Sequence, residues 1–113
     1  MNNLDLLTEA IEKRKPISFE YNKVGKTPGT RIGNVHVVFI FTAKNGAQST
    51  KVHIVQTAGI SDSKDEKFFP DFGTFNIEEL SNIIVLENEL CFEPFYEKYN
   101  PEWDGYNNPI AKV

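Results

Sequence analysis

The chain has 113 residues and a formal net charge of −4 at pH 7, and its 40% apolar content predicts one packed domain rather than a disordered chain. No apolar run approaches the ~20 residues of a membrane span, and the start of the sequence lacks the basic and apolar regions of a signal peptide. The single cysteine, Cys91, permits no internal disulfide, so we expect a soluble cytoplasmic protein with no membrane association.

The first predicted element is a short amphipathic helix over residues 4–14. Leu4, Leu7 and Ile11 recur at helical spacing and form an apolar stripe. One of the two asparagines before the helix can cap its first turn. Pro16 ends the helix, because the residue before a proline is driven out of the α region.

The next two segments predict a strand and a loop. Residues 16–22 alternate between apolar and polar side chains, as a half-buried strand does. The stretch 23–30 contains two glycines and a proline and is predicted to be a loop. Its Gly-Lys-Thr sequence lacks the glycine that a phosphate-binding loop needs five residues earlier, where Glu20 stands, so that motif is excluded.

A long hairpin is predicted in the middle of the chain. Residues 31–41 place apolar side chains on both faces, which predicts a strand that is either covered on both sides or bulged near Gly33. Asn45 and Gly46 predict a type I′ turn, because such a turn needs two residues that tolerate positive φ.

The return strand of this hairpin is predicted over residues 51–57. Because successive side chains point to opposite faces, Val52 and Ile54 share one face and Lys51 and His53 share the other. The aliphatic face would be buried in a small sheet. The opposite face would present an imidazole beside an ammonium group.

The last part of the chain is predicted to hold two more strands and an aromatic tail. Residues 59–70 form a polar loop, and strands over 73–77 and 83–86 are joined by a single helical turn. A small helix is possible near residues 93–98. The tail over 91–113 is rich in aromatic residues, so we expect it to pack on its own domain, on a second copy or on another partner.

Three segments together resemble a known family. They are Leu7-x-x-Ala10-Ile11 with Arg14-x-Pro16-Ile17-x-Phe19-x-Tyr21, then Gly29-x-Arg31, and then Gly73-Thr74-Phe75-Asn76-Ile77-Glu78-Glu79-Leu80. With one helix before five short strands, residues 4–88 resemble the WYL domain, a small SH3-like or Sm-like β-barrel found mainly in bacterial regulators. Val52-His53-Ile54 stands here in place of the Trp-Tyr-Leu signature.

The resemblance implies a mainly β (α+β) fold. Residues 1–90 would form the N-terminal helix and a five-stranded SH3-like barrel, and residues 91–113 the aromatic tail packed on the barrel or on a partner. It also implies a regulatory domain, of the kind used in transcription regulation, that senses a nucleotide or nucleic-acid fragment. No second helix precedes Pro16 to complete a helix-turn-helix, so direct reading of DNA sequence is not expected.

The charge distribution is compatible with an anionic ligand. Residues 13–51 carry eight basic residues against the single acid Glu20, whereas residues 52–113 have a net charge of −8. Such segregation can build an electropositive face. Alternatively, the two halves interleave in space and neutralise each other, as antiparallel strands allow.

Five residues are the candidate contacts for such an anion: Arg31, His36, Lys51, His53 and Lys26. Arg31 follows a glycine loop, where its guanidinium can clamp a phosphate or pair with an acid. The two histidines are an anion contact, a pH-sensing pair or ordinary strand residues. No spacing indicates a metal site or a catalytic triad, so we expect neither metal, nor cofactor, nor enzymatic activity.

The alternative hypothesis is a protein-interaction or dimerisation module without a small-molecule ligand. In that case an open sheet edge, or the aromatic tail over 91–113, would dock a partner or a second copy of the chain. A homodimer formed through the tail is one form of this hypothesis.

Overall fold

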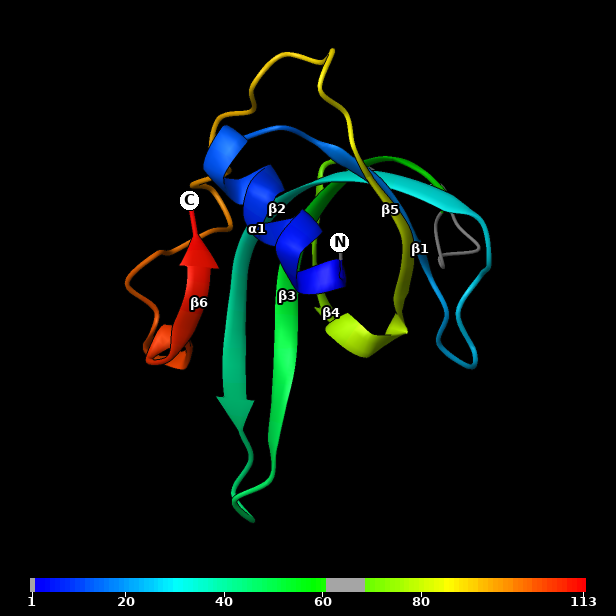
Figure 1. The fold of residues 1–113 in the computed structure, drawn as a ribbon. Coiled ribbons are helices and arrows are strands. Elements are labelled where there is room, and N and C mark those ends of the chain that lie inside the picture. Colours follow the sequence, from blue (N-terminus) through cyan, green and yellow to red (C-terminus); the bar gives the residue numbers. More distant parts are fainter. Residues whose placement is uncertain (1, 61–68) are drawn as a thin grey trace.

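The computed structural model describes residues 2–60 and 69–113. In this part of the chain there is one α-helix, α1 (Asn3–Lys13), followed by an antiparallel sheet (Figure 1). Its strands are β1 (Ile17–Tyr21), β2 (Thr30–Thr42), β3 (Gln48–Gly59), β4 (Asp71–Asn76), β5 (Leu80–Val85) and β6 (Pro109–Lys112). Short 3-10 turns, η1 (Ile77–Glu79) and η2 (Asp104–Tyr106), precede β5 and β6. Most of the predicted loop over 59–70 lies outside the described residues.

The sheet follows the order β4-β3-β2-β1-β5, and β6 pairs with β2. β1 and β6 share one edge of β2: Ile17 of β1 lies opposite Gly33, and Lys112 of β6 lies opposite Val37 (Figure 1). A mainly β, α+β fold is therefore confirmed, with six strands in the described residues rather than five. β4 and β5 end the sheet without pairing to each other there, so the predicted closure into a barrel is not observed.

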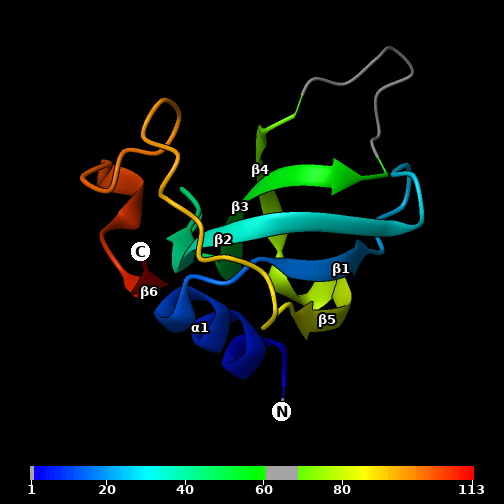
Figure 2. The same ribbon diagram turned by 90° about the horizontal axis from the view of Figure 1, so that it is seen from above.

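Helix α1 lies across one side of the sheet, against β2, β5 and β6 (Figure 2). The side chain of Asn2 accepts a hydrogen bond of 2.8 Å from the backbone N–H of Asp5 and so caps the first turn. Leu7 and Ile11 are buried as predicted, and the helix ends at Arg14, whose φ of 54° leaves the helical region. The predicted helix is confirmed, with boundaries shifted by one residue.

The hairpin between β2 and β3 is confirmed, but its predicted turn type is wrong. Gly46 has a φ of 88°, whereas Asn45 is not among the residues with positive φ. The N–H of Gly46 bonds to the carbonyl of Ala43, and the N–H of Ala43 bonds to the carbonyl of Ala47. This is the geometry of a longer loop with glycine in the left-handed position, where only one residue needs positive φ.

The predicted bulge in β2 is confirmed, and it follows from a close approach of two backbones. The pairing of β2 with β3 shifts register at Gly33 and again between Val35 and Val37. A Cβ atom at Gly33 would lie 2.7 Å from Cγ2 of Ile54 and 2.8 Å from the carbonyl oxygen of Val55, so a larger residue does not fit here without displacement.

Both faces of β2 and β3 are buried, by different parts of the chain. One face joins α1 and the other strands in the main core, which includes Val38 and Ile54. On the other face, Val37 and Phe39 pack against Tyr99 and Tyr106 of the tail. The tail is therefore packed on its own sheet. The possible helix near residues 93–98 is absent, and a hydrogen-bonded turn lies there instead.

Candidate functional site

The five residues predicted as anion contacts do not come together in one site. Arg31 and Lys26 line a first cavity, which we call the basic cavity. His53 lines a second cavity, which we call the aromatic cavity. His36 is buried under the tail, and the Lys51 side chain is held by a neighbouring strand.

The basic cavity has a volume of about 320 Å³ and is lined by residues of β1, β2, β3 and β4 and of the loop before β2. It is lined by Tyr21, Lys23, Lys26, Arg31, Gln56, Asp71, Gly73, Thr74 and Phe75. Three of these side chains are basic and one is acidic, so the lining has a positive net charge. Arg31 at the entry to β2 is 3% exposed, which places its guanidinium in the wall rather than in bulk water.

The guanidinium of Arg31 is held in a fixed orientation. Its Nη2 donates to the carbonyl oxygen of Thr27 at 3.1 Å, and its Nη1 lies 3.4 Å from Oε1 of Gln56. The amide of Gln56 is itself fixed, because its Nε2 donates to the carbonyl oxygen of Ile60 at 2.7 Å. The guanidinium also lies over the ring of Tyr21, 5.8 Å from its centroid.

Two exposed lysines stand at the same cavity on the loop before β2. The N–H of Lys26 bonds to the carbonyl of Lys23 at 3.0 Å, and this tight turn brings the two ammonium groups to one rim. Neither lysine forms an ion pair with any residue that the structure describes. Lys23 was not among the predicted contacts, although it lies in the same loop as Lys26.

The aromatic cavity has a volume of about 340 Å³ and lies between β3, β4 and the tail. Its lining is formed by His53, Phe72, Thr74, Lys98, Asn100, Trp103 and Tyr106. Thr74 belongs to both cavities, so the edge strand β4 separates them. Most of these residues were missed by sequence reasoning, because the tail residues reach β3 only through the folding of the tail over the sheet.

His53 is a neutral group in this cavity. Burial, with a smaller contribution from the charge of His36, lowers the pKa of His53 from 6.5 to about 4. Its Nδ1 lies 2.5 Å from the hydroxyl of Tyr106, and burial raises the pKa of that hydroxyl to about 12. The protonated phenol and the neutral imidazole share this hydrogen bond, and its direction follows the tautomer of the imidazole. His53 therefore carries no positive charge for an anion at neutral pH.

His36 is fully enclosed by the protein, between β2 and the tail. Its Nδ1 lies 2.9 Å from the carbonyl oxygen of Asn34, and its Nε2 accepts a hydrogen bond of 3.0 Å from the N–H of Phe95. The ring stacks on Phe92 at a centroid distance of 5.2 Å and is fully buried. Burial lowers the pKa of His36, partly offset by the bond to the Asn34 carbonyl. Both ring nitrogens are occupied by the protein itself.

Lys51 lines neither cavity. Its Nζ donates to the side-chain oxygen of Asn76, which lies directly opposite it on β4. The amide nitrogen of Asn76 in turn donates to Glu79. This chain of polar contacts joins β3, β4 and η1 at the surface.

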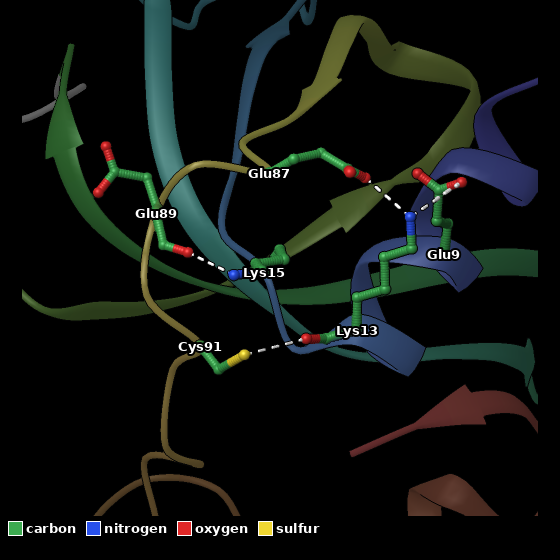
Figure 3. Close-up of polar contacts among 6 residues, drawn as sticks. All are labelled: Glu9, Lys13, Lys15, Glu87, Glu89 and Cys91. Carbon is green, nitrogen blue, oxygen red and sulfur yellow. Dashed lines mark hydrogen bonds and ion pairs between the residues drawn. The ribbon is translucent and has the colours of Figure 1, made fainter.

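A cluster of charged residues joins the end of α1 to the segment after β5 (Figure 3). Lys13 Nζ lies 2.8 Å from Glu87 and 3.9 Å from Glu9, and Lys15 Nζ donates to the backbone carbonyl of Glu89. The bond to Glu87 raises the pKa of Lys13 and lowers that of Glu87. Cys91 lies beside them, with its thiol 3.4 Å from the carbonyl oxygen of Lys13. Here the basic and acidic parts of the chain do neutralise each other.

Two features are absent from residues 2–60 and 69–113, a metal-binding cluster and a membrane-spanning helix. No group of three histidine, cysteine, aspartate or glutamate side chains within these ranges is arranged to hold a metal ion. No helix in the same ranges has the length and apolarity needed to cross a bilayer.

Comparison of the chain with protein-family models, with curated proteins and with solved structures finds no match. The resemblance to the WYL domain therefore stays a prediction. The two cavities hold the candidate functional residues of the chain.

Proposed function

We propose that the protein is a non-catalytic, WYL-like regulatory domain that binds an anionic ligand, a nucleotide or nucleic-acid fragment, in the basic cavity. The observation that carries this proposal is that Lys23, Lys26 and Arg31 line one cavity, together with the polar side chains of Gln56 and Thr74. The strand order β4-β3-β2-β1-β5, with α1 before β1 and η1 between β4 and β5, supports an SH3-like arrangement for the domain.

The chemistry of the cavity suits a phosphate group. Arg31 supplies a fixed positive charge in the wall of the cavity, because Gln56 and Thr27 hold its guanidinium in place. The exposed lysines add charge at the rim, where they attract an anion over a distance of about one Debye length, ~8 Å at physiological salt. Asp71 reduces the positive charge without cancelling it. The tyrosine ring below the guanidinium limits its movement.

A thermal-shift screen at low and at physiological salt tests this proposal. The probes are nucleoside triphosphates, short single-stranded DNA and RNA, and polyphosphate. A site-specific ligand at a hundred times its dissociation constant stabilises the folded state by about 2.7 kcal/mol. We expect one probe to raise the melting temperature at physiological salt. A shift that disappears with salt for every probe would contradict a specific site.

The variant Lys26→Ala should lower the affinity for that probe by roughly tenfold, because a charge-assisted hydrogen bond is lost. Lys44→Ala is the matched control. Lys44 is exposed at the hairpin tip, so this substitution removes the same charge at a position outside the cavity lining. Equal effects of the two substitutions would show generic charge attraction instead of a site.

A second candidate function is protein interaction or dimerisation, and it has one observation in its favour. In the described residues β5 pairs only with β1, and it presents the 58% exposed side chain of Ile84 next to its open edge. Sedimentation of the wild-type chain and of Ile84→Lys tests it. Loss of a dimer in the variant would support this function, and a monomer at all concentrations would exclude homodimerisation.

A further inference from the structure

The aromatic cavity lies on the other side of β4 from the basic cavity, and the proposed anion site does not use it. Its walls are formed by four rings, His53, Phe72, Trp103 and Tyr106. Trp103 is 48% exposed, so nearly half of the largest aromatic side chain in the molecule remains open beside this cavity. An exposed tryptophan in a lined cavity is a site for a ligand ring.

The rings are mutually supported and leave a defined orientation for a ligand. Trp103 lies nearly parallel to His53, with a centroid distance of 5.9 Å and an interplanar angle of 27°. Tyr106 stands edge-on to Trp103 at 5.0 Å and 86°, and Phe72 stands edge-on to His53 at 4.8 Å and 65°. Two parallel rings flanked by two edges favour a planar occupant that stacks on tryptophan over a bulky aliphatic one.

The polar groups of the cavity favour a ligand that forms a hydrogen bond with the imidazole and carries negative charge. The Nδ1 of His53 is bonded to the hydroxyl of Tyr106, whereas its Nε2 has no hydrogen-bond partner among the described residues. Lys98 is exposed in the lining and forms no ion pair within the described residues. The acids nearest in sequence, Glu102 and Asp104, do not line this cavity; they line a neighbouring depression that shares Trp103 and Tyr106 with it.

We propose that the aromatic cavity binds a planar heteroaromatic ring that carries an acidic group. The ring stacks on Trp103, a polar atom at its edge forms a hydrogen bond with Nε2 of His53, and the acidic group lies at Lys98. A volume of about 340 Å³ holds one such ring with its substituent. The chemistry is shared by the base of a nucleotide and by a free aromatic acid.

The single tryptophan of the chain makes this proposal directly measurable. Trp103 fluorescence of the full chain is titrated with adenosine monophosphate, with nicotinate and with ribose phosphate, and calorimetry repeats each titration. We expect saturable quenching by at least one of the first two probes and none by ribose phosphate, which has the anion without the ring. Quenching by adenosine monophosphate alone would indicate that the ligand is a nucleotide. Quenching by nicotinate alone would indicate that the ligand is a free aromatic acid.

Variants separate this site from the basic cavity. In calorimetry, Trp103→Leu should weaken binding of the active probe about fivefold or more, because base-aromatic stacking is lost. Lys98→Ala should weaken it too, and Lys26→Ala should not. No saturable binding of either ring-bearing probe would overturn the proposal. So would binding that survives Trp103→Leu but is lost in Lys26→Ala, since that result would place the ligand in the basic cavity.

Discussion

The backbone N–H of Phe95 donates a hydrogen bond of 3.0 Å to Nε2 of His36, and this bond fixes the aromatic tail to β2. The acceptor exists only while the imidazole is neutral, because a protonated Nε2 would present a second donor to the same N–H. Burial keeps His36 neutral by lowering its pKa. The docking of the tail is thereby linked to the protonation state of one side chain.

The first prediction is that the folded state loses stability as the pH falls below 6.5, the ordinary pKa of histidine. The pKa values of His36 and His53 are both lowered by folding, so below 6.5 the unfolded chain binds protons that the folded chain excludes. For His53, whose pKa is lowered from 6.5 to about 4, the loss of unfolding free energy by pH 5 is about 2 kcal/mol. Urea unfolding at pH values from about 7.5 to about 5 measures this loss of unfolding free energy, because carboxylates titrate mainly below that range.

The control for this prediction is the double variant His36→Gln/His53→Gln. It removes both imidazoles, so the remaining dependence of unfolding free energy on pH above 5 should be nearly flat, since carboxylates titrate at about 4. A wild-type protein whose unfolding free energy does not change between these pH values would contradict the assigned protonation states.

Truncation after Glu89 should remove the cooperative unfolding transition. The tail contributes the buried rings of Phe92, Tyr99 and Tyr106 and also strand β6, and each buried ring is worth up to about 3 kcal/mol. Their sum is comparable to the total stability of about 5–15 kcal/mol of a small domain. Thermal unfolding by circular dichroism measures the effect. Leu90→Ala is the control, because the side chain of Leu90 is 90% exposed and its loss should change the melting temperature little. A truncated chain that still melts cooperatively would refute the prediction.

Gly33→Ala should destabilise the protein by about 1–3 kcal/mol through overpacking. The added Cβ meets the Ile54 side chain and the Val55 carbonyl at 2.7 and 2.8 Å, and the backbone carbonyl is not free to move aside. Gly46→Asn provides the comparison, because its φ of +88° suits asparagine better than most residues and no atom lies within 4 Å. Chemical unfolding should show a large loss of unfolding free energy only for Gly33→Ala. Equal losses in the two variants would contradict overpacking at Gly33.

Tyr106→Phe should keep the ring packing and lose the hydroxyl that is hydrogen-bonded to His53. The imidazole Nδ1 is then left without its partner in a buried position, which costs about 1–3 kcal/mol. Urea unfolding gives the cost, and NMR titration of the imidazole of His53 shows whether its environment changed. An unchanged stability together with an unchanged histidine spectrum would mean that the hydrogen bond does not form in solution.

Local sequence patterns were sufficient for much of the fold and for part of the basic cavity. The spacing of Leu7 and Ile11 identifies α1, and the alternation in residues 16–22 identifies β1, because periodicity reports which face is buried. Arg31 and Lys26 were predicted together and do share a cavity, since they are separated only by a short loop.

The rest depended on pairing between distant segments. β6 was not predicted because its four residues pair with β2 across more than seventy positions of sequence, and no local pattern records that pairing. The aromatic cavity was missed for the same reason: Trp103 meets His53 only after the tail has folded over the sheet. His36 lies within the register shift between Val35 and Val37, so simple alternation could not assign its neighbours.

The most direct test of the anion-site proposal is a two-dimensional NMR titration of the nitrogen-labelled chain with adenosine triphosphate at physiological salt. We expect saturable shifts of the amide signals around Lys26, Arg31 and Gln56, which line the basic cavity, and we expect these shifts to be lost in Lys26→Ala. Shifts confined to the tail and β3 would assign the ligand to the aromatic cavity instead. Uniform small shifts over all exposed lysines, or none at all, would contradict the existence of an anion site.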